Sequence, residues 1–455
     1  DWGRFSAIKT TNLEAYVKFL KGKEHNFRRT PANVLEARKL AQEAIALDPE
    51  YGGGYVLLAH THVDINFVVV FGIVWFLWYI FMNPNTVMKL YTPMYGFALL
   101  VVLLSSIVLI ANVAGYFPFT EPSAGGNRVG RGILLTVVAF ILMLFIHYVI
   151  FWYFIGKLGV AYFSPQSIVA SGGTGAEPFV ARENASTAIV YFFTAFLWIA
   201  LFCNLGFGSW PWQTVGRGTL AWSRLFTILF FVSLIYIILF HPHVCHLFYP
   251  AQSKAGVSPW WEGFCETGSA FVGLGLVLSS LFWIVASGLL WEGNPWKLMN
   301  RDGEGNFVKG IVTFAATLIM GLIMMWILLK IFTVVWDEPF MGGQYTDGPD
   351  FRFIHAGEMA GFFILAAFIL KNYFGNFPNL ANIWARSIVR TVIAIAGGLL
   401  FYAFYYSPLA TFFLAKVPGF GQPDDTPLVW ILLFLSIIMI QSDFFEGWPL
   451  RKRED

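Results

Sequence analysis

Apolar residues beyond position 64 fall into long runs that are separated by short polar segments. A helix needs about 20 apolar residues to cross a hydrocarbon core of about 30 Å. Ten runs meet or approach this length, and each predicts a membrane-spanning helix. The predicted spans are 66–82, 94–116, 132–155, 186–208, 222–240, 267–290, 311–333, 355–375, 388–406 and 427–445. An even number of spans places both ends of the chain on one side of the membrane.

The first 64 residues follow a different pattern and hold 17 of the 56 charged residues. Thr30-Pro31 is a helix start, because Thr can cap a helix and Pro suits its first turn. Apolar residues then recur at helical spacing up to Asp48-Pro49. We therefore expect two domains, a soluble helical segment over 1–64 and a transmembrane domain over 65–455.

The segment ARKLAQEAIALDPEYGGGYVLLAHTH resembles a tetratricopeptide repeat. Ala37, Ala44 and Pro49 lie at the spacing of that repeat's small-residue and turn positions, and Tyr55 and Leu58 match the start of a following repeat. Residues 10–62 as a whole are similar to the repeat region of bacterial adenylate/guanylate-cyclase-type proteins. The resemblance implies a surface that binds a protein partner. A plain helical hairpin is the alternative.

Composition supports a polytopic membrane protein. Of the 455 residues, 57% are apolar and only 12% are charged, whereas soluble domains carry about 25% charged residues. The net charge of +2 and the absence of zinc-finger spacing argue against a nucleic-acid partner. Three cysteines are too few for a disulfide framework. The lipid bilayer is therefore the first expected partner.

Basic residues are unevenly divided between the two sets of loops. The segments that follow the even-numbered spans hold 13 Lys and Arg, whereas the opposite set holds seven. The positive-inside rule places the richer set in the cytoplasm. We therefore expect a multi-pass protein of a bacterial inner membrane with both termini cytoplasmic. The 13 residues are Arg128, Arg131, Arg217, Arg224, Lys297, Arg301, Lys309, Lys371, Arg386, Arg390, Arg451, Lys452 and Arg453.

The even-numbered spans end in similar short segments. Each contains a proline that directly follows an aromatic residue or, in one case, Asn. These are GYFPF, GSWPWQ, EGNPWK, GNFPN and EGWPL, and their prolines are 93, 84, 83 and 71 residues apart. Related starts recur in the following spans, with VGRG at 129–132 and 215–218 and FVKG at 307–310. Aromatic residues and Pro favour membrane boundaries in any case. The near-constant spacing nevertheless favours a two-helix hairpin repeated five times.

The expected fold is all-α, with about ten transmembrane helices as five tandem hairpins and a short N-terminal TPR-like segment. This plan is similar to that of the slow-anion-channel and tellurite-resistance/dicarboxylate transporters. The resemblance is one of architecture, and it implies transport without assigning any site residue.

The densest group of metal-ligand side chains is HPHVCH, residues 241–246. Imidazole and thiolate bind transition metals, so His241, His243, Cys245 and His246 are candidate ligands at the outer face. A transition metal or haem is the corresponding cofactor, although no cofactor is identified. The alternative is a wet interfacial segment in which Pro242 ends a helix.

A second polar group lies in the eighth predicted span. Arg352, His355 and Glu358 recur every three residues and share one side of a helix. An ionisable group in a membrane span usually faces a cavity or a partner. We expect a proton or cation path at these residues, with Lys330 at a similar depth as a second candidate partner of Glu358. The alternative is an interfacial helix end in which Arg352 pairs with Glu358.

Three functions remain open from the sequence. The first is a transporter or channel for a small solute or ion, with its path between the hairpins. The second is a membrane subunit of a redox or metal enzyme that uses the outer His cluster. The third is a membrane scaffold whose head recruits a protein partner. Whether the protein is an enzyme is not decided by the sequence.

Overall fold

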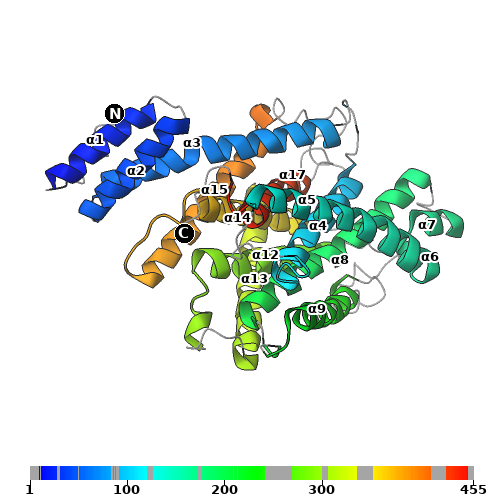
Figure 1. Ribbon diagram of the computed structural model, residues 1–455. Coiled ribbons are helices and arrows are strands. Elements are labelled where there is room, and N and C mark those ends of the chain that lie inside the picture. Colours follow the sequence, from blue (N-terminus) through cyan, green and yellow to red (C-terminus); the bar gives the residue numbers. More distant parts are fainter. Residues whose placement is uncertain are drawn as a thin grey trace. The chain divides into compact units, whose positions relative to one another are not determined.

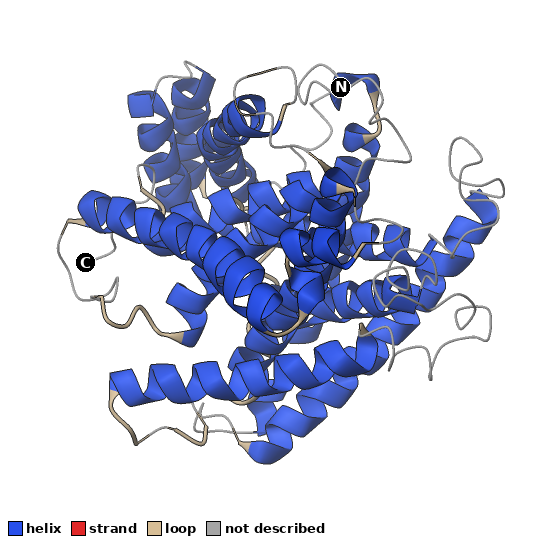
Figure 2. Ribbon diagram, turned by 90° about the vertical axis from the view of Figure 1, so that its right-hand side faces the viewer, coloured by secondary structure: helices blue, strands red, loops and turns tan. Residues whose placement is uncertain are grey.

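The computed structural model is helical throughout the residues it describes, and these contain no strand (Figure 2). The described residues are 10, 12–27, 31–49, 51–83, 86, 88, 92–119, 127–172, 177–208, 210–212, 214–240, 269–299, 306–335, 352–410 and 427–448. They divide into two compact units, one of residues 1–73 with 369–379 and one of residues 74–368 with 380–455.

The first unit contains α1 (Leu13–Phe27), α2 (Pro31–Leu47) and most of α3 (Gly52–Leu77). Helices α1 and α2 lie side by side (Figure 1). Their contact is made by small side chains, because Ala15, Ala37, Ala41 and Ala44 are all fully buried. Helix α3 runs through position 64 without interruption, so the polar and apolar parts of the sequence share one helix.

The second unit contains the remaining helices, apart from the last four residues of α14, which belong to the first unit. In chain order they are η2 (Trp78–Met82), α4 (Pro93–Val108), η3 (Leu109–Val113), α5 (Arg128–Leu144), η5 (Phe145–Ile155), α6 (Gly156–Leu158), η6 (Ala161–Phe163), α7 (Pro165–Ser171), α8 (Pro178–Gly206), α9 (Arg217–Leu239), α12 (Ser269–Val285), η8 (Ala286–Leu290), η9 (Trp296–Met299), α13 (Phe307–Val335), α14 (Arg352–Asn372), α15 (Ile383–Tyr405), α17 (Pro427–Met439) and η10 (Ile440–Phe444). Elements η2, η3, η5, η8 and η10 are π-helical, and η6 and η9 are 3₁₀-helical.

Nine helices within the described residues are long and apolar enough to cross a membrane, which fits a multi-pass membrane protein. They are Met94–Val113, Arg128–Leu158, Pro178–Gly206, Arg217–Leu239, Val272–Leu290, Phe307–Phe332, Phe353–Asn372, Ile383–Tyr405 and Pro427–Phe444. Each overlaps one of the spans expected from the sequence. The first expected span, 66–82, corresponds to the shorter apolar stretch Val69–Met82.

Burial separates these nine helices into two classes. We call α4, α8, α12, α14 and α17 the inner helices, because 72–83% of the residues in the most apolar stretch of each are buried within the protein. In α5, α9, α13 and α15, the outer helices, only 17–33% is buried. The two classes alternate along the chain. Exposed apolar side chains on the outer helices, such as Phe226 and Phe230, are the surface expected to face lipid.

The inner helices form a closed circle of contacts. Helix α4 packs against both α8 and α17, and α8 packs against α12. Gly357 of α14 lies against Leu274 and Gly275 of α12. Gly361 of the same helix lies against Leu428 and Ile431 of α17. Because these glycines have no side chain, the neighbouring helices approach closely there, as is common in membrane bundles.

Similar backbone turns follow the inner helices, and two hydrogen bonds describe them. The amide two residues before the proline donates to the carbonyl eight residues before it, as in Tyr116 N to Ile110 O at 2.8 Å and Gly293 N to Ser287 O at 2.8 Å. Asn376 and Gly447 make the equivalent bonds at 3.0 and 2.8 Å. In all five turns, the residue directly before the proline donates its amide to the carbonyl three residues before itself, as in Trp210 N to Phe207 O. These turns define one end of each inner helix, here called the turn end.

Four of the turns hold a residue other than glycine in the left-handed region: Tyr116, Glu292, Asn376 and Glu446 have φ between 52° and 62°. This conformation costs about 1–2 kcal/mol for an ordinary residue. Each of the two glutamates forms an ion pair that offsets the cost. Glu292 accepts from Arg386 at 3.1 Å and Arg390 at 2.8 Å, and Glu446 pairs with Arg131.

Candidate functional site

A narrow cavity lies between the five inner helices. Its volume is about 50 Å³, and every inner helix contributes to its wall. Representative lining residues, one from each helix in chain order, are Val101, Leu197, Leu281, Ile364 and Leu432. Figure 1 shows α4, α12, α14 and α17 gathered in this part of the second unit. The cavity therefore follows from the circle of helix contacts rather than from a single loop or helix pair.

The wall of this central cavity is apolar apart from one hydroxyl side chain. Thr194 of α8 is the polar residue among the lining side chains, and no charged residue is included. A space of this size has room for few water molecules, and an apolar cavity tends to stay dry. Phe97, in the first turns of α4, and Phe368, near the end of α14, lie toward opposite ends of the cavity. The geometry is that of a small apolar cavity between packed helices.

His355 and Glu358 form a buried pair on α14. The Nδ1 atom of His355 lies 2.8 Å from Oε2 of Glu358, and the two residues are 9% and 2% exposed. The His355 ring also packs edge-on against Phe332 of α13, with centroids 6.4 Å apart. Glu358 is one helical turn from Gly361, which lines the central cavity, although neither His355 nor Glu358 does.

The structure describes one of the other two side chains expected at this site. Lys330 is exposed, and its Nζ atom lies 5.9 Å from the ring centroid of Trp326 on its own helix, α13. The structure gives no bond between Lys330 and Glu358. Arg352 begins α14, but its side chain is outside the described part of the chain. The pair of His355 and Glu358 is thus the part of the predicted group that the structure brings together.

The predicted metal ligands His241, His243, Cys245 and His246 all lie outside the described residues. Within the described residues, no group of three or more His, Cys, Asp or Glu side chains is arranged to hold a metal ion.

His147 is a polar residue that the sequence did not single out as a site. It is fully buried in η5, and neither ring nitrogen has a hydrogen-bond partner among the described residues. Its ring lies 4.8 Å from the rings of Tyr148 and Trp152 and 5.9 Å from that of Tyr95. One signal was available in the sequence, because His147 is the only residue between Leu144 and Ile155 that is neither aliphatic nor Phe, Tyr or Trp.

Basic residues at the turn end are bound to the turns. Arg217 of α9 donates to Gly115 O at 3.1 Å, and Arg224 donates to Asn112 O at 3.4 Å and Gly208 O at 2.6 Å. Arg390 of α15 is 1% exposed and donates to Leu290 O at 3.0 Å. The loop charges that indicate orientation in the sequence therefore also tie the outer helices to the ends of the inner helices.

Comparison of the chain with protein-family models, curated proteins and solved structures finds no match.

Proposed function

We propose that the protein conducts a small solute or ion through the space between the five inner helices. The observation that carries this proposal is the central cavity, to which all five of these helices contribute. A pathway across a membrane needs a continuous wall of helices whose backbone groups are satisfied internally. A ring of buried helices surrounded by lipid-facing helices supplies such a wall, and the dry constriction between the Phe97 and Phe368 positions represents its closed state.

The test is flux into proteoliposomes that contain the purified protein. Phe97→Ala combined with Phe368→Ala removes the two largest side chains from the wall, and the double variant should raise flux of small ions or neutral solutes by at least about tenfold. Phe226→Ala is the matched control, because Phe226 is 64% exposed on α9. Unchanged flux in a folded double variant, with the control also unchanged, would contradict conduction through this cavity.

The hairpin repeat belongs to the same proposal. Five tandem hairpins, counted with the span at 66–82, would put every turn on one face of the membrane, and the excess of basic residues there supports a cytoplasmic location. Cysteines introduced at 171 and 345 should react with an impermeant reagent added outside sealed bacterial cells. Reaction from outside at 128–131 would show the opposite orientation, with both termini outside.

His355 and Glu358 are proposed as a proton-sensitive element beside the path. A carboxylate within the bilayer is costly unless it is paired or protonated, so a change in the pairing of Glu358 changes the charge next to α14 and α13. Glu358→Gln keeps the shape and removes the charge. If flux depends on pH between 5 and 8, this variant should flatten that dependence. A folded Glu358→Gln protein with an unchanged profile would make the pair structural.

Two other readings make different predictions. A membrane subunit of a redox or metal enzyme would carry a stoichiometric metal or haem at the 241–246 segment, which metal analysis and an absorption spectrum of the purified protein would reveal. A scaffold would lose its partner when residues 1–64, with their TPR-like helices, are removed, while the membrane part would show no flux in proteoliposomes.

A further inference from the structure

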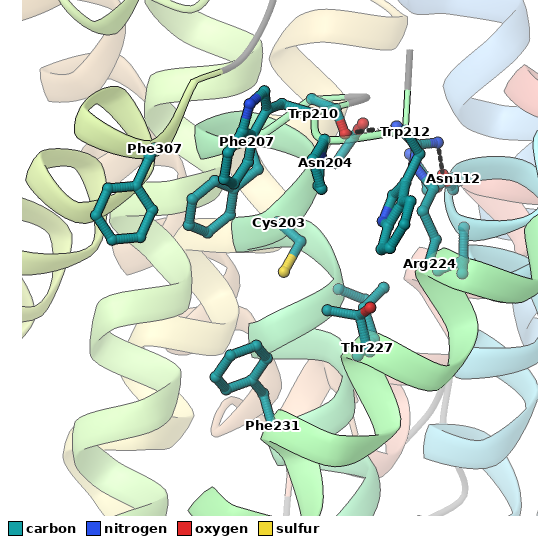
Figure 3. A pocket seen from close by; sticks show the side chains of 15 residues that line it. Asn112, Cys203, Asn204, Phe207, Trp210, Trp212, Arg224, Thr227, Phe231 and Phe307 are labelled. Carbon is teal, nitrogen blue, oxygen red and sulfur yellow. Dashed lines mark hydrogen bonds between the residues drawn. The ribbon is translucent and has the colours of Figure 1, made fainter. Parts of the chain in front are cut away.

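A second cavity lies beside the central one, at the turn end of α8. It has a volume of about 190 Å³ and is here called the lateral pocket. Its wall is formed by helices α8 and α9 and by the turn at 207–212, with Asn112 and Val113 of η3 on one side and Phe307 of α13 on another. Figure 3 shows Asn112 and Arg224 at one side and Phe207 and Phe307 at the opposite side, with Cys203 between them.

Five aromatic side chains line the lateral pocket. Phe207 stacks on Trp210 with centroids 5.9 Å apart, and Trp210 lies 6.0 Å from Phe307. Phe231 and Phe307, which border the pocket, are 44% and 56% exposed on helices expected to face lipid. A ligand dissolved in the bilayer therefore has access from the side. Aromatic walls favour a planar ring, which gains offset-stacked or edge-to-face contacts.

A polar group inside this apolar space lacks a partner. The hydroxyl of Thr227 forms no hydrogen bond with any described residue, although Thr136, Thr187, Thr317 and Thr391 on other helices each donate to the carbonyl four residues earlier. Thr227 is ten residues into α9, about 15 Å along the helix from its start. At that depth water is scarce, and an unpaired hydroxyl is costly.

Asn204 of α8 lines the same pocket, and its amide likewise forms no hydrogen bond with a described residue. The size of the pocket limits the ring: an apolar cavity of about 150 Å³ holds a benzene molecule, so about 190 Å³ holds one ring with a small substituent.

We propose that the lateral pocket binds a membrane-soluble aromatic alcohol with a single ring, whose hydroxyl bonds to Thr227 while its ring packs among Phe207, Trp210 and Phe231. The proposal concerns binding alone and does not depend on conduction through the central cavity.

Phenol and toluene are the matched probes, because they differ in one hydroxyl and are close in shape. The protein is a full-length Cys245→Ser, Cys265→Ser variant in detergent, in which Cys203 is the remaining thiol. Because Cys203 lines the pocket, a bound ring should slow its alkylation by N-ethylmaleimide. With concentrations compared within the micelle, half-maximal protection of Cys203 should need about 2- to 12-fold less phenol than toluene, as expected from one added hydrogen bond.

Two substitutions locate the effect. Thr227→Val in this background should abolish the preference for phenol while leaving the ring contacts, and Thr227→Phe should fill the pocket and remove protection by both probes. Thr136→Val is the control, because that hydroxyl donates to Gly132 O at 2.7 Å on α5 and does not line the pocket. It should keep the preference.

Equal protection by phenol and toluene would overturn the proposal and identify a pocket for hydrocarbon only, such as a lipid chain. Absence of protection by either probe, or a preference that survives Thr227→Val, would overturn it as well.

Discussion

The turns after α12 and α8 share a backbone design but differ in how the adjacent outer helix closes them. The residue three positions before the proline is left-handed in both, with φ of 57° at Glu292 and 59° at Gly208. Arg390 of α15 and Arg224 of α9 each stand eight residues after the N-cap of their helix. At α12 the arginine binds the carboxylate of Glu292, whereas at α8 there is no side chain at the equivalent position and the lateral pocket lies beside the turn.

The difference shows how one repeated turn can serve two purposes. A glutamate in a left-handed conformation is unfavourable by itself, so its presence at position 292 is explained by the two arginines that converge on it. A glycine at 208 adopts the same conformation without cost and leaves space next to Arg224. The first turn is therefore expected to stabilise the bundle and the second to provide a binding site.

The largest effect is expected from Arg390→Met. Arg390 is 1% exposed and bonds both Leu290 O and Glu292. The buried bond to Leu290 O should contribute about 1.5–3 kcal/mol to the free energy of unfolding, and the bond to the partly exposed Glu292 about 0.2–1 kcal/mol, so the loss of both should lower it by about 2–4 kcal/mol. Denaturant unfolding of the detergent-solubilised protein measures this. A smaller loss of unfolding free energy than that caused by Arg386→Met would contradict a central role for Arg390.

A smaller loss is expected from Gly208→Ala. A methyl group at φ 59° should cost about 1–2 kcal/mol of unfolding free energy. Gly208→Glu should have the same backbone cost, but it places a carboxylate at the position equivalent to Glu292, near Arg224. The Glu variant should therefore be more stable than the Ala variant in the same unfolding experiment. If the two variants are equally destabilised, the turns are not interchangeable.

Arg386→Met should have a weaker effect than either. Arg386 reaches Glu292 at 3.1 Å, but its side chain is 23% exposed and that of Glu292 is 41% exposed. Partly solvated ion pairs contribute about 0.2–1 kcal/mol. The loss should shrink further in high salt, and a loss that is independent of salt would show that Arg386 acts through packing instead.

The smallest effect is expected in the first unit, where Lys18 of α1 pairs with Glu43 of α2. The hydrogen bond raises the pKa of Lys18 and lowers that of Glu43. The stabilisation should therefore be lost when the pH falls through the lowered pKa of Glu43 or rises through the raised pKa of Lys18. Lys18→Met should change thermal stability less than Arg386→Met does, and it should remove this pH dependence. A persistent dependence would assign it to other groups.

The sequence predicted the helices well because their signal is local. Length and hydropathy are set by the bilayer thickness, so nine of the ten predicted spans coincide with helices of sufficient length. The aromatic–proline segments likewise predicted where the inner helices end. The His355–Glu358 pair was visible too, since residues three apart on a helix are neighbours.

Tertiary structure alone decided which helices are inner. Lipid is as apolar as a protein core, so a buried helix such as α17 and an exposed helix such as α9 look alike in hydropathy. It also showed Lys330 exposed beside Trp326 and Glu358 buried beside His355, because hydropathy does not fix the direction in which a side chain points. The central cavity and the lateral pocket arise from packing between distant segments. No local pattern encodes a space whose walls come from several helices, whereas each helix is encoded in its own run of residues.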